Sequence, residues 1–151
     1  MAVRDATPDD LAEILAMVRE LAEYEREPDA VVLEPDEFAR NVFGTDAVAH
    51  ALIAETPGGE IAGFAIWFRT FSTWLGKTGI WLEDLFVRPQ HRRSGVGREL
   101  LDALRTRTDG RVEWAVLDWN VLGHDFYRSL GATPQDEWTT WRWLPPAVPP
   151  S

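Results

Sequence analysis

Two adjacent carboxylates, Glu83 and Asp84, interrupt the apolar run from Ile80 to Val87. Side chains alternate between the two faces of a strand, so we expect these carboxylates on opposite faces, with at least one of them sheltered. A carboxylate that loses solvent has a raised pKa and can accept a proton, directly or through water. Glu83 is therefore a candidate general base. The alternative is an acid that is paired with a core arginine.

A basic, glycine-containing segment follows this run. Arg92-x-x-Gly95-x-Gly97 opens an amphipathic stretch in which Leu100 and Leu104 share one helical face. The start of a helix presents unpaired N–H groups and partial positive charge, and glycines let a ligand approach the backbone. The segment predicts a site for a phosphate-bearing ligand, with a purely structural turn as the alternative. A dinucleotide fingerprint would need glycine in place of Leu100, and the Gly-Lys-Ser/Thr of a Walker loop is absent.

Tyr127 is a third candidate, seven residues after Asn120. Seven residues make two helical turns, so a helix capped by Asn120 would hold both side chains on one side. A phenol with an ordinary pKa of about 10 stays protonated at neutral pH and can donate its proton to a departing group. The structural alternative is an aromatic pair of Phe126 and Tyr127 packed in a core.

Hydrophobic periodicity predicts the elements that position these groups. A helix start at Thr7-Pro8 and a hairpin turn at Thr56-Pro57-Gly58-Gly59 punctuate the first half of the chain, and residues 72–79 read as a loop. The pattern indicates an α/β (α+β) fold with a mixed, mostly antiparallel central sheet flanked by helices. We expect one domain over residues 1–151, ending in a frayed Pro-rich tail at 145–151. The expected strands are 3–6, 47–55, 61–71, 80–87, 111–118 and 138–144, and the expected helices are 8–25, 35–43, 95–108 and 121–129.

Composition narrows the function. The net charge of −10, from 15 basic and 25 acidic residues, argues against nucleic acid or an anionic membrane as the main partner. Residues 88–111 hold seven arginines and three acids, a local charge of +4 that leaves −14 elsewhere. An anion site in an acidic protein explains this contrast, with a solvated helix face as the alternative. The acidic remainder suits a cationic second substrate.

Several other classes are disfavoured. The chain has no cysteine, and its three histidines show no metal-ligand spacing, so we expect no metal site. It has no Gly-x-Ser-x-Gly nucleophile turn. The N-terminus lacks an apolar signal core and no stretch reaches eighteen apolar residues, so we expect a soluble, cytoplasmic protein.

Several ordered segments, together with the glycine turn, carry a family resemblance. They are Arg4 to Pro8, Glu20 to Glu25, Phe71 to Lys77, Trp81 to Val87, Ala115 to Asn120 and Phe126 to Ala132. In this order the chain resembles the GCN5-related N-acetyltransferase (GNAT) superfamily, in its spermidine/spermine and thialysine N-epsilon-acetyltransferase branch. The resemblance implies the GNAT fold, acetyl-CoA as co-substrate and a small primary amine as acceptor. It also implies a homodimer in which two chains share the acceptor channel.

The resemblance assigns roles as well. Glu83 would be the base and Tyr127 the acid, and backbone N–H groups where the central strand separates from its neighbour would polarise the thioester carbonyl. Coenzyme contacts would fall on Leu85, Phe86, Val87, Arg92, Arg93, Ser94, Gly95, Val96, Gly97, Arg98, Asn120 and Tyr127. Acceptor contacts would fall on Tyr24, Glu25, Ser72, Trp74, Glu83, Asp84 and Trp141, a set of acids and aromatic faces that suits an ammonium group.

Two departures bear on the acceptor. Polyamine acetyltransferases have an acid where this chain has Ser72, and the segment from Trp74 to Glu83 is one residue longer than usual. Loss of that carboxylate favours thialysine, a lysine-like amino acid or a short diamine over a long polyamine. The remaining alternatives are a polyamine acetyltransferase, a non-catalytic acyl-CoA-binding module and a protein N-acetyltransferase.

Overall fold

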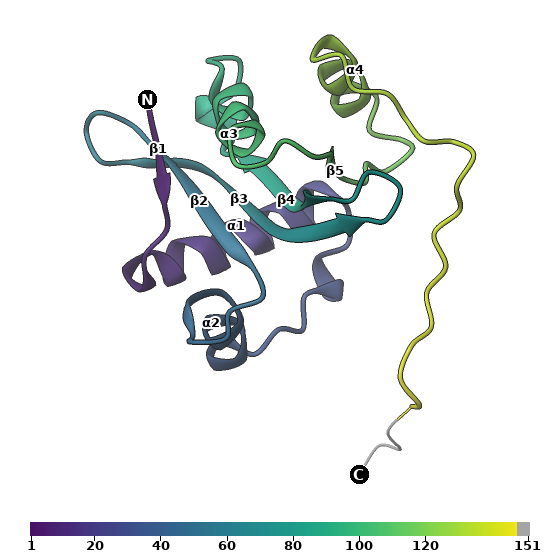
Figure 1. Ribbon diagram of the computed structural model, residues 1–151. Helices are drawn as coiled ribbons and strands as arrows, with labels where there is room; N and C mark the ends of the chain where they lie inside the picture. The colour runs from purple at the N-terminus through teal and green to yellow at the C-terminus, as the bar shows by residue number, and fades with distance from the viewer. Residues whose placement is uncertain (148–151) are drawn as a thin grey trace. The chain divides into compact units, whose positions relative to one another are not determined.

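A computed structural model describes residues 1–147 of the chain. It divides into two compact units, Met1–Ala115 and a second unit that begins at Val116. The first unit is built on a five-stranded sheet in the order β1-β2-β3-β4-β5, shown in Figure 1. Neighbours are antiparallel from β1 to β4, whereas β5 runs parallel to β4. The strands are β1 Ala2–Asp5, β2 His50–Glu55, β3 Ile61–Ser72, β4 Lys77–Val87 and β5 Val112–Glu113.

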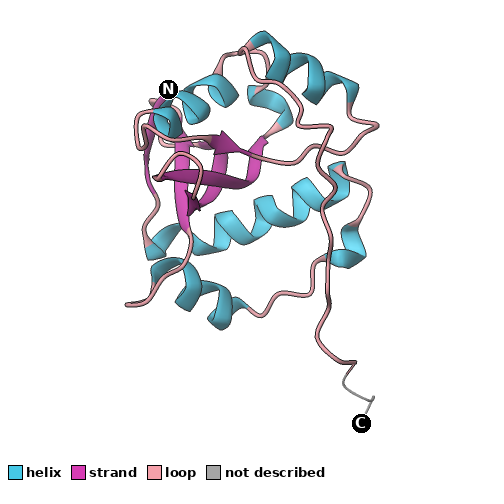
Figure 2. Cartoon of the chain, turned by 45° about the vertical axis from the view of Figure 1, so that its right-hand side comes forward, coloured by secondary structure: helices cyan, strands magenta, loops and turns pink. Residues whose placement is uncertain are grey.

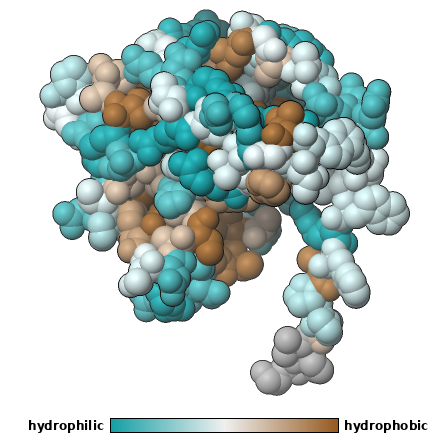
Figure 3. Space-filling view, in the orientation of Figure 1, coloured by the Kyte–Doolittle hydropathy of each residue, from teal (hydrophilic) through white to brown (hydrophobic). Residues whose placement is uncertain are grey.

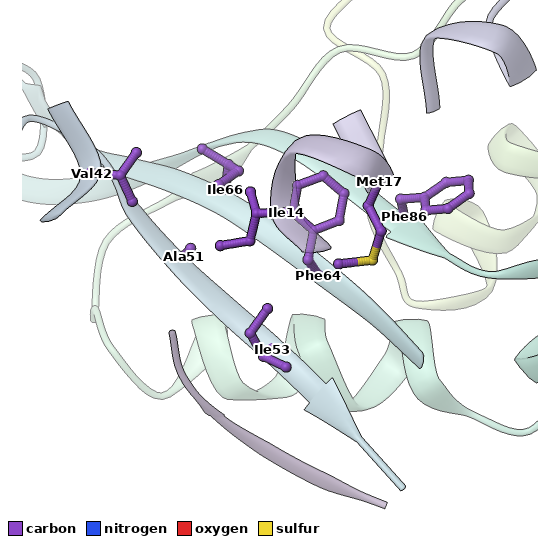
Figure 4. Packing of buried hydrophobic residues seen from close by; sticks show 8 residues of the cluster. All are labelled: Ile14, Met17, Val42, Ala51, Ile53, Phe64, Ile66 and Phe86. Carbon is purple, nitrogen blue, oxygen red and sulfur yellow. The ribbon is translucent and has the colours of Figure 1, made fainter. Parts of the chain in front are cut away.

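One face of the sheet carries the main core with helices α1 (Leu11–Tyr24) and α2 (Pro35–Phe43). Ile14 and Met17 of α1 and Val42 of α2 pack on apolar residues of three strands in Figure 4, which are Ala51, Ile53, Phe64, Ile66 and Phe86. Exposed apolar residues flank α2 at Val32 and Val48, and brown residues gather in this lower region of Figure 3. The 3.6-residue period of α1 and the two-residue period of the strands converge on this core.

The opposite face of the sheet is covered by α3 (Val96–Arg105), which contacts β1 to β4. Leu100 and Leu104 of α3 are fully buried, as the apolar spacing predicts. Leu52 and Ala65 are paired across β2 and β3 and alternate with the residues of the main core, so they line this second face. Helices on both faces of a mixed sheet confirm the predicted fold class.

An ionic network fixes the start of the chain. The Arg4 guanidinium binds both oxygens of buried Asp10 at 2.8 and 2.9 Å and the Glu55 carboxylate at 2.6 Å. Asp10 also accepts the Thr7 N–H at 2.8 Å, just before the 3-10 turn Pro8–Asp10. The Arg4 guanidinium lowers the pKa of Asp10 below its usual value. These contacts tie β1 to β2 and to the start of α1.

The second unit contains α4 (Val121–Ser129), whose N-terminus is capped by Asn120 as predicted. The Asn120 side chain accepts the Gly123 N–H at 3.1 Å. After α4 the chain is drawn as loop to the end of the described residues in Figure 2. The expected strand at 138–144 is therefore wrong, because that segment has no ladder partner within residues 1–147. Within the expected tail, 145–147 are described without regular structure and 148–151 lie outside the described residues. The single domain over 1–151 stays a prediction.

Two other boundaries differ from expectation. The strand expected at 111–118 is reduced to Val112–Glu113, since β4 and β5 pair only at Ile80–Val112 and Trp81–Glu113. The loop expected at 72–79 is shorter, because β3 and β4 continue to Ser72 and Lys77 and form a hairpin. The length of an apolar segment in the sequence did not reveal which of its residues pair with a neighbouring strand.

Candidate active site

A β-bulge in β4 organises the candidate site. Asp84 pairs with Ile66 and Leu82 pairs with Trp67, so Glu83 is an extra residue without a partner on β3. Partners across an antiparallel ladder share a face, which places Leu82 on the α3 side and Asp84 on the side of the main core. A bulge reverses the alternation in this way and reorients the side chains around it.

The bulge corrects the expectation that Glu83 and Asp84 lie on opposite faces. Trp81 pairs with Phe68 on the main-core side, and its indole N–H donates to Glu83 Oε2 at 3.2 Å. Asp84 is paired with Ile66, just as Phe86 is paired with Phe64, so it lies on the main-core side. Glu83 therefore lies on the same side as Asp84. One extra residue has brought two consecutive carboxylates together on one face of β4.

Asp84, not Glu83, is the sheltered carboxylate. Glu83 is exposed, whereas Asp84 is partly buried. Burial is the main cause that raises the pKa of Asp84 from 3.8 to about 6, and repulsion from Glu83 and Glu25 adds to it. The expectation that at least one of the pair would be sheltered is confirmed, but the candidate base chosen from the sequence is the exposed member.

The C-terminal end of α1 supplies two further predicted residues. Tyr24 is the last residue of α1 and Glu25 follows it as the C-cap. Burial raises the pKa of Glu25. The Glu25 carboxylate also repels the charge of Asp84, so α1 and the β4 bulge bring these carboxylates into electrostatic contact. Glu25, Glu83 and Asp84 thus belong to one neighbourhood, with Tyr24 next to Glu25 in the chain, and their contact with an acceptor stays a prediction.

A surface cavity of about 380 Å³ lies beside this neighbourhood. Its lining is Glu20, Glu23, Tyr24, Phe86, Pro89 and Arg92. The Arg92 guanidinium is 5.2 Å from the centroid of the Tyr24 ring and 5.6 Å from that of Phe86, and its Nε donates to the Val87 carbonyl at 2.9 Å. Sequence reasoning missed Glu20 and Glu23 as lining residues, although their spacing of three residues puts them on neighbouring positions of one helix.

The glycine segment between β4 and α3 has the geometry of an open anion site. Gly95 precedes α3 with φ +84°, and Arg93 has φ +65°. Arg93, Ser94 and Gly95 are exposed, and no side chain within residues 1–147 caps the helix. A Cβ built on Gly95 would meet nothing within 4 Å. The start of α3 can therefore receive a phosphate on its N–H groups, and this observation fits a coenzyme A diphosphate.

Ion pairs revise the charge argument made from the sequence. Three of the seven arginines at 88–111 are ion-paired: Arg88 with Glu13 and Glu20, Arg98 with Asp102, and Arg107 with Asp5. The Arg88 pairs join the end of β4 to α1. The positive charge that these arginines can offer to a ligand is therefore smaller than the count of +4. Backbone N–H groups at the start of α3 then make up the larger part of the predicted phosphate site.

The coenzyme residues predicted on β4 lie where the strand loses a neighbour. Among residues 1–147, β4 pairs with β5 only as far as Trp81. Leu85, Phe86 and Val87 continue to pair with β3 but have no β5 partner on their other edge. Phe86 is buried beside Met17 in Figure 4. This edge of β4 is therefore open beside the three residues, and contact of their N–H groups with a ligand carbonyl stays a prediction.

Two predicted acceptor residues lie far from the bulge in the same chain. Trp74 is 81% exposed in the β3–β4 turn, and Ser72 Oγ accepts the Leu75 N–H at 3.2 Å. β4 begins at Lys77, directly after this turn. Asp84 is seven residues farther along the strand, which puts it about 23 Å from Lys77. The structure therefore does not bring Ser72 and Trp74 together with Asp84 within one chain.

The remaining predicted residues belong to the second unit. Asn120 caps α4, and Tyr127 lies in that helix, partly buried, with its ring 5.3 Å from that of Phe126. Trp141 is 92% exposed in the loop that follows α4. Their roles stay predictions.

Residues 1–147 contain no group of three or more His, Cys, Asp or Glu side chains that could hold a metal ion. They also contain no helix that is long and apolar enough to cross a membrane.

Comparison with known proteins decides the family. The model of the Acetyltransferase (GNAT) family matches residues 13–132. The chain belongs to this family. It is an N-acetyltransferase, which disfavours the non-catalytic acyl-CoA-binding module, and its family uses acetyl-CoA as co-substrate.

Relatives of this GNAT protein support the branch predicted from the sequence. It is 33% identical to thialysine N-epsilon-acetyltransferase of Bos taurus over 150 residues, which cover 92% of this chain and 88% of the relative. It is 33% identical to spermidine/spermine N(1)-acetyltransferase-like protein 1 of Homo sapiens over 140 residues, 86% of this chain but 20% of that protein. The crystal structure of a mutant BH1408 protein from Bacillus halodurans has the same fold, with a TM-score of 0.78, 22% identity and coverage of 95% and 100%.

Proposed function

We propose that this GNAT protein transfers the acetyl group of acetyl-CoA directly, in a ternary complex, to the amine of thialysine, a lysine-like amino acid or a short diamine. The observation that carries the proposal is the bulge in β4. It presents Glu83 and Asp84 on one face of β4, just before the stretch Leu85 to Val87 that has no β5 partner within residues 1–147. Relatives named thialysine N-epsilon-acetyltransferase cover almost the same length of chain.

We assign the binding of acetyl-CoA, the acetyl donor, to the loop between β4 and α3 and to the open edge of β4. N–H groups from Arg93 to Arg98, at the positive end of α3, bind the diphosphate, while Ser94, Gly95, Val96 and Gly97 form its backbone cradle. N–H groups of Leu85 to Val87 on the open edge of β4 bind the thioester carbonyl and stabilise the negative charge that develops on its oxygen. Asn120 contacts the pantetheine side of the coenzyme. Tyr127 donates the proton that the departing thiolate needs.

The acceptor is assigned to the acidic face of β4 and α1. Glu25, Glu83 and Asp84 attract an ammonium group, and the Tyr24 ring offers an aromatic face. Ser72 in place of an acid favours a short acceptor. Trp74 and Trp141 complete the channel, and the span of about 23 Å between the hairpin turn and Asp84 makes a second copy of the chain the source of Trp74. A homodimer and a cytoplasmic location are parts of this proposal.

A polyamine acceptor is the second candidate. It is favoured by Glu23 in the cavity, since this carboxylate can hold a second ammonium group away from the reacting one, whereas Glu20 is paired with Arg88. A relative named spermidine/spermine N(1)-acetyltransferase-like protein agrees with this alternative.

Release of free thiol with a panel of amines tests both acceptors. Purified protein with acetyl-CoA should acetylate thialysine, lysine or putrescine with a higher kcat/KM than spermidine. A preference for spermidine would favour the polyamine acceptor, and no thiol release above the hydrolysis background with any amine would overturn the proposed function. Mass spectrometry of the products identifies which nitrogen carries the acetyl group.

A further inference from the structure

We propose that Asp84, rather than Glu83, accepts the proton of the acceptor amine, while Glu83 is an exposed anion that attracts the ammonium group. This inference rests on the proposed function. It differs from the assignment that the sequence favours, in which Glu83 is the base.

The first argument is position. The bulge at Glu83 places Asp84 on the main-core side of β4, opposite Ile66 and two residues from Phe86. Phe86 lines the cavity beside Tyr24, and two residues of strand span about 7 Å. Asp84 therefore lies on the same face of β4 as a residue that lines the cavity, about 7 Å along the strand from it, and its side chain is only partly buried.

The second argument is the partner of each carboxylate. Glu83 Oε2 accepts the Trp81 indole N–H at 3.2 Å, and the rest of the side chain faces solvent. For Asp84, no hydrogen bond or ion pair of the side chain is found among residues 1–147. A hydrogen bond to a carboxylate stabilises its charged form and weakens it as a base, so Asp84 is the better acceptor.

The third argument is the electrostatic surroundings of Asp84. Glu83 on its own strand and Glu25 at the end of α1 are the charged groups that act on it most strongly, and both are acids. The Arg92 guanidinium and the Tyr24 phenol lie farther along the same side, stacked beside Phe86. Desolvation and these two acids raise the pKa of Asp84 to about 6. A carboxylate at this value accepts a proton roughly a hundredfold more readily than one at 3.8, yet it is still mostly ionised at neutral pH.

The proton and electron balance of the step is complete. Asp84 takes one proton from the substrate ammonium, and the neutral amine forms the C–N bond at the thioester carbonyl. The C–S bond breaks, the sulfur keeps the electron pair, and Tyr127 protonates it. The second proton lost by the amine nitrogen restores Tyr127. Asp84 then releases its proton to water, so the products are the amide, the free thiol and one proton.

Kinetics against pH test the assignment with three isosteric variants. The kcat/KM for the preferred amine should fall on the acidic side with an inflection near pH 6 in the unmodified enzyme. Asp84→Asn should lose two to four orders of magnitude in kcat and lose that inflection. Glu83→Gln should keep the inflection but move it to lower pH, because one repelling charge is gone, and should mainly raise KM for the amine. Asp46→Asn, an exposed acid in another loop, is the matched control.

Carboxyl ¹³C NMR gives a readout that does not depend on turnover. The Asp84 carboxyl should titrate near pH 6 in the enzyme without substrates and at lower pH in Glu83→Gln. An acidic inflection retained in Asp84→Asn but abolished in Glu83→Gln, or an Asp84 titration at the ordinary value near 4, would overturn the role of Asp84 while leaving the acetyltransferase function standing. An unmodified enzyme that acetylates no amine would instead overturn the proposed function, and this role with it.

Discussion

At the level of single residues, the ionised Asp84 should weaken the fold that holds it. Its folded pKa of about 6 lies above the unfolded value of 3.8, so the folded chain binds the proton more tightly. Stability from this group is fully present below the unfolded pKa and is lost as pH rises through about 6. Asp84→Asn should therefore be more stable than the unmodified chain at pH 8, by on the order of 1–2 kcal/mol after discounting for partial solvent exposure.

Urea unfolding at several pH values checks this sign. The stability difference between Asp84→Asn and the unmodified protein should shrink as pH falls from 8 to 4, because Asp84, with a folded pKa of about 6, is then protonated and neutral in the folded state. Asp46→Asn should show no such slope. If the stability of Asp84→Asn relative to the unmodified chain were instead lower at pH 8 than at pH 4, the charged carboxylate would have to be stabilised by a partner.

Tyr127 is tested by removal of one oxygen. If its hydroxyl protonates the leaving thiolate, Tyr127→Phe should lose about two to three orders of magnitude in kcat and keep its affinity for acetyl-CoA. The ring remains, so its contact with Phe126 and the thermal unfolding midpoint should be retained. Steady-state kinetics and calorimetric titration with coenzyme A separate the two effects. Unchanged turnover would remove Tyr127 from the mechanism.

At the level of elements, the turn into α3 depends on a left-handed backbone conformation. Gly95 has φ +84° and open space around its Cα, so Gly95→Ala costs about 1 kcal/mol in backbone strain without any clash. Relaxation of that strain would turn the first N–H groups of α3 away from a bound diphosphate. We expect the Kd for acetyl-CoA to rise about tenfold or more while KM for the amine changes little.

Gly59→Ala supplies the matched control for this prediction. Gly59 has φ +87° in the β2–β3 turn, so the strain is similar but the turn is not part of the donor site. Its loss of stability should equal that of Gly95→Ala, with no loss of acetyl-CoA affinity. Calorimetry with coenzyme A and thermal unfolding measure both quantities. Equal losses of affinity in the two variants would show that strain alone is responsible.

The elements also show how far sequence reasoning reaches. Helices α1 to α4 and the hairpin strands were predicted because local apolar periods and caps specify them. The strand expected at 138–144 and most of the one at 111–118 failed, since a strand also needs a partner edge and β4 separates from β5 after Trp81. The glycine turn and the acidic end of α1 were predictable from spacing. The bulge at Glu83 was not predictable from the sequence, because an extra unpaired residue in a strand leaves no recognisable pattern of residue types.

At the level of the whole molecule, the hairpin turn and the bulge make a prediction about assembly. Trp74 lies in the turn before Lys77, and Lys77 and Asp84 are about 23 Å apart along β4, too far for one small amine to contact both the turn and Asp84 within one chain. If two chains of a symmetric dimer share the acceptor channel, each site combines Asp84 of one copy with Trp74 of the other. Trp74→Ala and Asp84→Asn would then each disable both sites of their own dimer.

Mixing the two variants decides between a shared and a separate site. After co-expression or subunit exchange, half of the dimers are mixed, and each mixed dimer has one site with both Trp74 and Asp84 intact. Activity should recover to about a quarter of the unmodified value, since one of two sites works in half of the dimers. Sedimentation analysis of the same samples establishes that dimers are present. Activity no higher than the mean of the two variants would show that the two chains do not complement each other, which would overturn the shared acceptor channel.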